Sequence, residues 1–382
     1  MLILVINCGS SSIKYKLYDA AKDLFPAEGV IEKIGEKEPN HTHKVPGRDP
    51  LKRKVAAGDH HEGMGIILDI LVDKDHGVIK TIEEIGGVGH RVVHGGEEFN
   101  SSVLINDAVI ASITKFSKLA PLHNPPALAG IKATMKLLSH KPQVAVFDTA
   151  FHQTMPSEAY IYAIPYKFYK KYGVRRYGFH GTSHKYVAGK AAKLLGKPAD
   201  KLKIVTCHLG NGCSITAVLN GKSIDTSMGL TPLEGLVMGT RCGDIDPALV
   251  TFLMEKENLS VQEIDSLLNK KSGLLGISEI SNDMRENLAA IKEGNEKAKL
   301  AVDVFTYRIK KYIGAYIAAM NGIDAVVLTA GIGENNTDIK VRLERELSEI
   351  LRRFDAKILV IPTKEEWMIA METYDVIKGK KG

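Results

Sequence analysis

Two segments far apart in the chain share one pattern, and this repeat constrains the fold more than any other feature. Residues 4–19 (LVINCGSSSIKYKLYD) and residues 204–219 (IVTCHLGNGCSITAVL) each hold an apolar run, a cysteine, a turn of glycine with serine or asparagine, and a second run. Strand-forming runs on either side of a turn of small residues predict a β-hairpin. The repeat therefore predicts a duplicated core whose two turns face one another across a cleft.

The composition restricts the class of protein. The chain has 382 residues, of which 44% are hydrophobic and 25% charged, as in a soluble protein with room for two cores. The net charge of +6 is modest, which favours anionic ligands and gives little support for nucleic acid. No apolar run reaches the length of a membrane span, and the opening MLILVI is too short for a signal peptide. We therefore expect a cytoplasmic protein that binds neither nucleic acid nor membrane.

Further strands and helices follow from local patterns, and they place a domain boundary near residue 150. In the first half we expect a helix over 63–72, a short strand within 87–99, a helix over 126–138 and a strand over 143–152 that delivers Asp148 at its end. In the second half we expect a helix that Thr182 or Ser183 caps, strands over 203–229, a helix over 299–320 and a strand over 324–331. We expect one domain over 1–150, joined by a C-terminal helix over 366–382, and a second domain over 151–365.

Residues 36–65 have no clear pattern. They carry three prolines and the histidines at 41, 43, 60 and 61. We interpret them as an irregular polar excursion on the surface. A metal site is the weaker alternative, because we find no carboxylate or cysteine that completes a ligand set.

Three glycine-rich turns indicate a phosphate or nucleotide site. Backbone N–H groups in such turns can point at one anion, and glycine leaves room for its approach. Two of the turns lie in the repeated hairpins, and the third lies in TAGIGENN (329–336), which would suit the adenosine end. The Walker A pattern GxxxxGK[ST] does not occur, and the hairpin turns lead into strands rather than helices. A cleft between two phosphate-binding hairpins is the remaining arrangement for a nucleotide kinase.

Four motifs carry a resemblance to a known family: NCGSSSIKYKLYD, GHRVVHGGEEF, RRYGFHGTSHKYV and TPLEGLVMGTRCGDIDP. They resemble the acetate kinase family almost letter for letter, and the resemblance covers nearly the whole chain. It implies reversible, ATP-dependent phosphorylation of acetate to acetyl phosphate with Mg²⁺ or Mn²⁺. It also implies an α/β fold of two duplicated ribonuclease-H-like domains, as in actin and Hsp70, with the active site in the interdomain cleft. The resemblance further implies that the first domain is the acyl and metal side, that the second domain binds the nucleotide, and that the chain forms a homodimer.

The resemblance also implies roles for individual residues. Charge spreads over the oxygens of a transferring phosphoryl group, so fixed cations and donors supply most of the catalysis. Arg91 and Arg241 are expected to flank that group, and His180 to donate a hydrogen bond in the transition state. Asp148 is expected to orient Arg241 or the metal shell, because a carboxylate nucleophile needs no general base.

The remaining site residues are expected around the substrates. Acetate is expected to place its carboxylate near Arg91 and its methyl group against Val93, Leu122, Phe179 and Pro232. The metal is expected beside Asn7 and Glu365. The nucleotide phosphates are expected beside Asn7, Ser10, Ser12, Lys14, His123, His208, Leu209, Gly210, Asn211 and Gly212. The adenosine is expected beside Asp283, Met284, Arg285, Gly331, Ile332, Gly333, Glu334 and Asn335.

Other functions compete with this interpretation. Propionate or butyrate kinase is the nearest, because one methylene changes selectivity by only about 1–3 kcal/mol in an apolar pocket. A non-kinase ATP-binding protein of the Hsp70 or actin type would share the hairpins but not the arginine and histidine motifs. Two departures from the family also stand out: residues 345–366 are shorter than usual, and Glu279 occupies a position where glycine is common.

All four cysteines lie in segments assigned to the site: Cys8, Cys207, Cys213 and Cys242. No CxxC spacing suggests a disulfide framework or a zinc ribbon. They can be buried and inert, or phosphate-binding loops can favour their thiolates. We expect Cys8 and Cys213 to be reactive and to be covered by MgATP.

Overall fold

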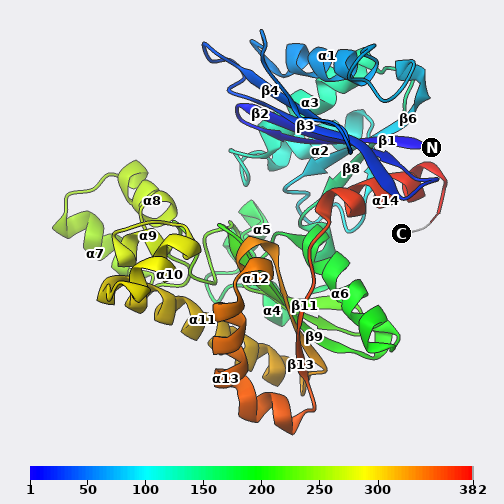
Figure 1. The fold of residues 1–382 in the computed structure, drawn as a ribbon. Coiled ribbons are helices and arrows are strands. Elements are labelled where there is room, and N and C mark those ends of the chain that lie inside the picture. Colours follow the sequence, from blue (N-terminus) through cyan, green and yellow to red (C-terminus); the bar gives the residue numbers. More distant parts are fainter. Residues whose placement is uncertain (381–382) are drawn as a thin grey trace. The chain divides into compact units, whose positions relative to one another are not determined.

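The structure is a computed structural model, and it describes residues 1–380. The described chain divides into two compact units. One unit comprises Met1–Ala150 together with the described residues from Lys364 onward, and the other comprises Phe151–Thr363 (Figure 1). The chain thus leaves the first unit and returns to it at its C-terminal end.

The first unit contains an eight-stranded mixed sheet in the order β5-β4-β3-β2-β1-β6-β8-β7. Its strands are β1 (Leu2–Gly9), β2 (Ser12–Asp19), β3 (Leu24–Glu32), β4 (Asn40–Lys44), β5 (Leu51–Lys54), β6 (Ile85–Val92), β7 (Val103–Leu104) and β8 (Gln143–Phe147). The predicted first hairpin is confirmed, since β1 and β2 are antiparallel and Gly9 lies opposite Ser12. Strand β6 is parallel to both β1 and β8.

The second unit contains a five-stranded sheet in the order β11-β10-β9-β12-β13. Its strands are β9 (Lys203–Leu209), β10 (Cys213–Leu219), β11 (Lys222–Thr226), β12 (Ala325–Thr329) and β13 (Lys357–Val360). In both sheets the first hairpin has an antiparallel strand beyond it on one side and two parallel strands on the other. The order β3-β2-β1-β6-β8 therefore recurs as β11-β10-β9-β12-β13, which confirms the predicted duplication.

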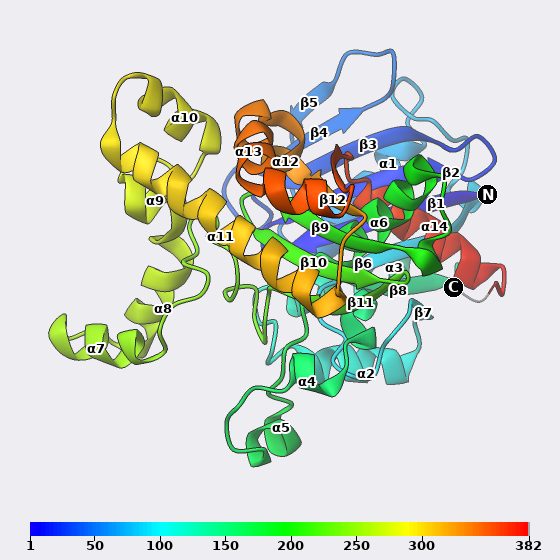
Figure 2. The same cartoon turned by 90° about the horizontal axis from the view of Figure 1, so that it is seen from below.

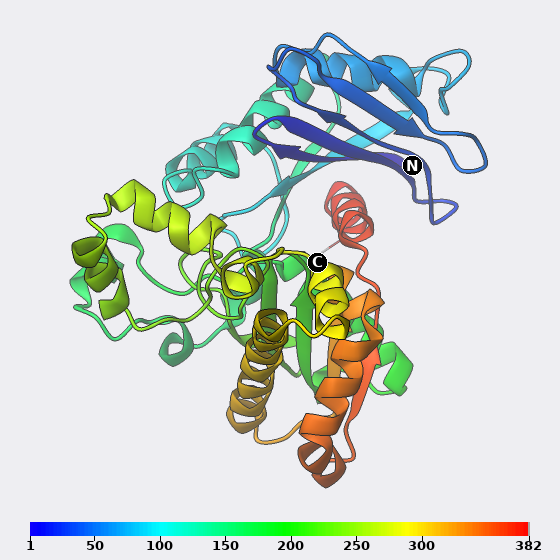
Figure 3. The ribbon, with the colours of Figure 1, turned by 60° about the vertical axis from the view of Figure 1, so that its left-hand side comes forward.

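Helices cover both faces of the first sheet (Figure 3). The helices of this unit are α1 (His60–Leu71), α2 (Asp107–Phe116), α3 (Asn124–Leu137) and α14 (Glu365–Ile377). Alternate residues of β2, such as Ile13 and Leu17, belong to the core under α1 and α3. Ile3 and Val5 of β1 belong instead to the core under α14.

Glycines on β6 let α14 pack directly on the strand. A Cβ atom at Gly89 would lie 2.2 Å from Oγ1 of Thr373, and one at Gly87 would lie 2.3 Å from Cδ1 of Ile377. Both distances are far shorter than a van der Waals contact. The close approach of α14 therefore depends on the absence of side chains at these two positions.

The helices of the second unit include two that pack on its sheet. Helix α6 (Gly181–Leu195) contacts β9 and β12, and the long helix α11 (Glu296–Met320) lies across β9 and β10 (Figure 2). The others are α4 (Ser157–Tyr160), α5 (Lys167–Tyr172), α7 (Ala248–Lys256), α8 (Val261–Lys270), α9 (Gly273–Ser278), α10 (Met284–Lys292), α12 (Ala330–Asn335) and α13 (Thr337–Arg353). Over residues 1–380, no helix combines the length and the apolar character that a membrane crossing requires.

The prediction of an irregular excursion over 36–65 is wrong, because β4 and β5 extend the first sheet there. His41 and His43 of β4 are buried, and the hydroxyl of Tyr15 lies 3.0 Å from Nε2 of His41 and 2.6 Å from Nδ1 of His43. The hydroxyl of Tyr15 thus joins both rings inside the sheet, whereas Nδ1 of His41 is buried and has no hydrogen-bond partner among residues 1–380. The alternation of inward histidines with an outward threonine is a strand pattern in which the inward residues are polar.

Two predicted local features also differ from the structure. Neither Thr182 nor Ser183 caps α6; the helix begins at Gly181, after His180 in the left-handed conformation (φ 56°). Ser183 lies inside the helix, where its hydroxyl contacts other side chains. The third glycine-rich segment is not an open turn, because β12 ends at Thr329 and α12 follows at once.

Candidate active site

Arg91 and Asp148 form a tight ion pair in the first unit. Arg91 lies near the end of β6, and Asp148 directly follows the parallel neighbour β8, so both reach the same edge of the sheet. Nη2 of Arg91 lies 2.6 Å from Oδ2 of Asp148, and Nε lies 3.1 Å from the same oxygen. Asp148 is buried, and its charge raises the pKa of Arg91 above the ordinary value. The carboxylate therefore fixes the guanidinium as a permanent cation in one orientation.

Glu365 is the first residue of α14, and its acidity is perturbed. Burial raises the pKa of Glu365 to about 7, and the negative charges of Asp148 and Glu366 add to the effect. The cations Arg91 and Lys14 act in the opposite direction without overcoming it. A divalent cation beside this carboxylate would favour its ionised form.

Asn7 and Lys14 lie opposite one another on the first hairpin. Together with Glu366 they line a cavity of about 220 Å³ over strands β1 to β4. Residues 1–380 contain no cluster of three or more His, Cys, Asp or Glu side chains that could hold a metal ion. Mg²⁺ commonly uses one or two protein oxygens together with water and substrate phosphates, so Asn7 and Glu365 suit this ion.

The other predicted residues of the first unit differ in exposure. Val93 is buried just beyond β6, whereas the Leu122 residue is 69% exposed. His123 is exposed at the start of α3. Ser10 and Ser12 flank the turn of the first hairpin, where Nε2 of His60 contacts the carbonyl of Gly9 at 2.8 Å. That contact braces the turn against α1.

In the second unit, a chain of hydrogen bonds supports His180. Its Nδ1 lies 2.8 Å from Oγ of Ser214, and that oxygen lies 2.8 Å from Nε2 of His184. Nδ1 of His184 in turn contacts Oγ1 of Thr206 at 2.7 Å. Burial holds the pKa of His184 well below its ordinary value, so the ring stays neutral. His184 and Ser214 thus orient His180 from the core.

His208 completes this group. Its ring stacks on that of His180 with centroids 4.1 Å apart, and its Nδ1 lies 2.8 Å from Oγ of Ser183. The structure therefore brings two predicted residues together, His180 and His208. It adds three that sequence reasoning missed: Ser183, His184 and Ser214. The available signal for His184 was its place one helical turn after His180 in YGFHGTSH.

Arg241 is a cation surrounded by neutral groups. Its Nη1 donates to the carbonyl of Pro232 at 3.1 Å and lies 3.7 Å from Sδ of Met238; no carboxylate of residues 1–380 forms an ion pair with it. Burial lowers the pKa of Arg241. A Cβ atom at Gly212 would lie 3.4 Å from Nη1 of Arg241 and 3.6 Å from Cε1 of His180. The turn after β9 therefore passes beside both side chains, where an anion would meet a desolvated guanidinium.

The residues predicted to bind adenosine differ in exposure: some are buried or hydrogen-bonded within the protein, and others lie at the surface. Oε1 of Glu334 accepts hydrogen bonds from the N–H groups of Ala330 (2.7 Å) and Thr363 (3.0 Å), so its carboxylate holds α12 in place. Asp283 caps α10 and pairs with the exposed Arg285. Met284, Ile332 and Gly333 of this set are buried, and Gly331 and Asn335 are exposed. Of the residues predicted for the phosphates, Leu209 is buried, Gly210 and Gly212 are half-buried and Asn211 is exposed, and Phe179, predicted for the acyl pocket, is buried.

The expectation of reactive cysteines in the two hairpin turns is wrong. Cys8 and Cys213 are buried, and burial raises the pKa of each thiol to about 12. Burial also raises the pKa of Cys207 and of the half-buried Cys242. Desolvation of the thiolate outweighs any donors that the turns supply.

We therefore expect a disulfide reagent at pH 7.5 to label Cys242 first in the folded protein. A thiol with a pKa near 12 is ionised in about one molecule in 3 × 10⁴ at this pH, so Cys8 and Cys213 should react only on unfolding. Peptide mapping of the labelled chain measures this order. During treatment with the reagent, the Cys8→Ser, Cys213→Ser double variant should lose activity as fast as the parent. Resistance of that variant to the reagent would contradict the assignment of Cys8 and Cys213 as unreactive.

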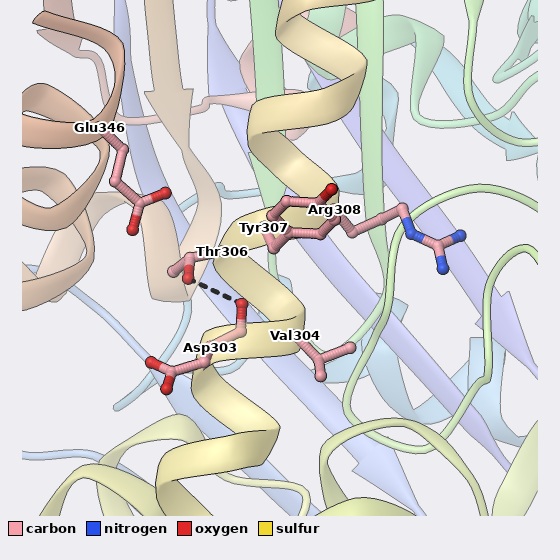
Figure 4. A pocket seen from close by; sticks show the side chains of 6 residues that line it. All are labelled: Asp303, Val304, Thr306, Tyr307, Arg308 and Glu346. Carbon is pink, nitrogen blue, oxygen red and sulfur yellow. Dashed lines mark hydrogen bonds between the residues drawn. The ribbon is translucent and has the colours of Figure 1, made fainter.

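A larger cavity lies elsewhere in the second unit, beside α11 and α13. It has a volume of about 380 Å³, and Figure 4 shows the residues that line it: Asp303, Val304, Thr306, Tyr307, Arg308 and Glu346. None of the predicted site residues is among them. This cavity is therefore separate from the residues expected to perform chemistry.

Comparison with known proteins gives consistent matches over the full chain. The model of the acetokinase family matches residues 2–371. The acetate kinase of Halothermothrix orenii is 53% identical over 398 aligned positions, which cover 99% of this chain and 100% of the relative. That alignment is longer than the chain itself, so the relative has residues with no counterpart here.

Two solved structures extend the likeness to three dimensions. The crystal structure of Porphyromonas gingivalis acetate kinase matches with a TM-score of 0.95 and 46% identity, over 98% of this chain and 99% of that one. A propionate kinase from Francisella tularensis matches with a TM-score of 0.90 and 43% identity, over the same shares. The two-unit α/β fold is thus that of known acyl kinases.

Proposed function

The chain belongs to the acetokinase family, and from that premise we propose that it transfers the γ-phosphoryl group of ATP to acetate, giving ADP and acetyl phosphate, and catalyses the reverse reaction. The observation that carries the proposal is Arg241. A half-buried guanidinium with neutral partners, beside a glycine-rich turn and His180, is suited to a transferring phosphoryl group. A binding protein without chemistry would have no use for it.

The proposed mechanism assigns positioning and charge to the protein. One oxygen of the acetate carboxylate attacks the γ-phosphorus while the bond to the β-phosphate oxygen breaks, so no proton has to be removed. Arg91, fixed by Asp148, and Arg241 offset the charge on the transferring oxygens. We assign Ser214 as the acceptor from Nε2 of His184 and the donor to Nδ1 of His180, which leaves the His180 proton on Nε2 as a donor.

The predicted metal ion fits the same scheme. Mg²⁺ or Mn²⁺, when bound, neutralises charge on the nucleotide phosphates. Asn7 and Glu365 would hold it through their oxygens, and Lys14 and the serines of the turn would lie beside the phosphates. Asp148 would act through Arg91, the arginine that it pairs with, and its role at Arg241 or the metal shell stays a prediction.

We propose that residues 1–150 with the C-terminal helix form the acyl and metal side, and that residues 151–365 bind the nucleotide. The resemblance supports a homodimer. The modest net charge and the composition support a cytoplasmic enzyme that binds neither nucleic acid nor membrane.

A coupled assay tests the function directly. The protein is incubated with ATP, Mg²⁺ and acetate, propionate or butyrate, and hydroxylamine traps the acyl phosphate as a coloured hydroxamate. We expect the highest kcat/KM with acetate. A preference for propionate would favour the second candidate, which the likeness to the Francisella tularensis propionate kinase supports. No acyl phosphate from any of the three acids would contradict both.

We expect Val93→Ala to raise the propionate-to-acetate ratio of kcat/KM by about fivefold or more. Val93 follows Arg91 by two positions, which places both side chains on one side of the chain as it leaves β6. Removing two methyl carbons makes room for the extra methylene of propionate. One methylene in an apolar pocket changes the discrimination between two substrates by about 1–3 kcal/mol. Val92→Ala is the matched control, because Val92 faces the core under α2 and α3. An equal ratio in the two variants would remove Val93 from the acyl pocket.

A further inference from the structure

The segment that carries Arg241 and Pro232 has no regular structure of its own. Strand β11 ends at Thr226 and α7 begins at Ala248, so this connection is longer than most loops inside a domain. Arg241 must nevertheless stay within a few tenths of an ångström of its working position. The contacts of the segment show what holds it.

Asp244 closes the part of the segment that contains Arg241. Its Oδ1 accepts from the N–H of Gly235 at 2.8 Å, and its own N–H donates to the carbonyl of Gly235 at 2.9 Å. Inside this ring the N–H of Met238 donates to the carbonyl of Arg241 at 3.1 Å. A Cβ atom at Gly235 (φ 108°) would lie 2.5 Å from the carbonyl oxygen of Ser227. The ring is thus tightly folded on the backbone around it.

The same carboxylate joins the ring to the long helix α11. The hydroxyl of Tyr312 donates to Oδ2 of Asp244 at 2.8 Å, and Nη1 of Arg308 lies 3.3 Å from that oxygen. Arg308 also donates to the carbonyl of Asp244 at 3.2 Å. Figure 4 shows Arg308 extending away from the carboxylates of Asp303 and Glu346, which lie on the other side of α11. Asp244 therefore receives both a charge and a neutral donor from one turn of a rigid helix.

Glu234 provides a second anchor just before the ring. Nη2 of Arg176 donates to Oε1 of Glu234 at 2.6 Å, and the hydroxyl of Tyr162 donates to its other oxygen. That hydroxyl in turn accepts from the N–H of Leu230 at 3.0 Å. Because Arg241 donates to the carbonyl of Pro232, the two anchors act on connected parts of one segment.

We propose that Asp244 is a positioning residue for phosphoryl transfer: it fixes the ring over 235–244 to α11 and so holds Arg241 beside the glycine-rich turn. This inference rests on the proposed function. Asp244 touches no reacting atom and acts through Arg241. Small displacements of a group that stabilises a transition state have large effects on rate, whereas substrate binding through other contacts is retained.

Asp244→Asn tests the proposal against a closely matched control. We expect the variant to lower kcat by about tenfold, with KM for ATP within about twofold of the parent. The control is Asp303→Asn: Asp303 also pairs with an arginine, Arg342, and its side chain is 40% exposed against 37% for Asp244. Each substitution removes the negative charge from an aspartate–arginine pair at α11. Only Asp244 belongs to the ring over 235–244. A kcat within twofold of the parent in a folded Asp244→Asn variant would overturn the proposal.

A double variant shows whether Asp244 acts through Arg241. In an Arg241→Ala background, Asp244→Asn should lower kcat by less than about twofold, because the group it positions is already absent. The same tenfold loss in both backgrounds would overturn the proposal. A merely structural role would produce that result.

Hydrogen exchange gives a readout that does not depend on activity. We expect the amides of Gly235 and Met238 to exchange faster in Asp244→Asn than in the parent and in Asp303→Asn. Unchanged exchange over 235–244 would overturn the proposal. A parent protein that makes no acyl phosphate but shows this difference would contradict the proposed function while leaving the anchoring of the ring supported.

Discussion

Arg241→Ala should lower kcat by about a hundredfold or more, and Arg91→Ala should do the same. Removing one donor that stabilises developing charge commonly reduces kcat by about 10²–10³. Arg241 is half-buried and has neutral partners, so no carboxylate of residues 1–380 competes with a ligand for its charge. The measurement is kcat with ATP and acetate saturating. A loss below about tenfold for both variants would remove these arginines from the site.

The chain offers a close control for Arg91. Arg342 has a side chain that is 23% exposed, like Arg91, and each pairs with an aspartate at 2.6 Å. Arg342→Ala should lower stability but leave kcat within about twofold. If Arg342→Ala and Arg91→Ala reduced kcat equally, the effect of Arg91 would be one of folding. Arg91→Lys keeps a charge but loses the fork that fits Asp148, so we expect an intermediate loss.

The free energy of unfolding should fall as the pH drops from 6.5 to 4, because buried histidines stay neutral in the folded protein. Burial lowers the pKa of His41 and of His90 to about 4 each. In the unfolded chain these rings take up protons near pH 6.5, so below that pH the unfolded state binds more protons and gains stability. The stabilisation is complete above pH 6.5, and about 3 kcal/mol per ring is lost by pH 4.

Trp367 is the only tryptophan of the chain, and it reports on the unit that contains both histidines. Its Nε1 donates to Oδ1 of Asp23 at 2.6 Å, so its fluorescence should change when the first unit unfolds. Denaturant titrations at pH 7.0, 5.5 and 4.5 give the free energy at each pH. His41→Gln should reduce the dependence on pH, whereas His140→Gln, at an exposed position, should leave it unchanged. A parent midpoint that does not move between pH 7.0 and 4.5 would contradict the prediction.

Local patterns predicted the parts of the fold that depend on neighbours in sequence. The two hairpins, the strand before Asp148 and the helix that ends at Met320 follow from alternation, periodicity and turn residues. The order of the strands then showed that the two halves have the same topology. Strand β4 was missed because its inward residues are histidines, and their burial depends on Tyr15, which lies 26 positions before His41.

The resemblance to a known family identified the residues of the candidate site, but it did not predict which side chains contact one another. The pairing of Arg91 with Asp148 follows from β6 and β8 lying side by side, which no local pattern gives. The support of Arg241 by Asp244 joins a loop to a helix more than sixty residues later in the chain. The cysteine prediction failed for a related reason. The sequence showed polar turns around Cys8 and Cys213, whereas burial of the thiols decides their acidity.

The packing of α14 on Gly87 and Gly89 has a consequence for the order in which the protein can assemble on the ribosome. The apolar face of the first sheet, with Ile3 and Val5, is covered by α14, which follows the whole second unit in the chain. Translation at about 5–20 residues per second leaves that face without its helix for on the order of ten seconds or longer. The second unit is one uninterrupted stretch, so it completes its own core first. The core under α14 therefore cannot be completed until that helix has left the exit tunnel.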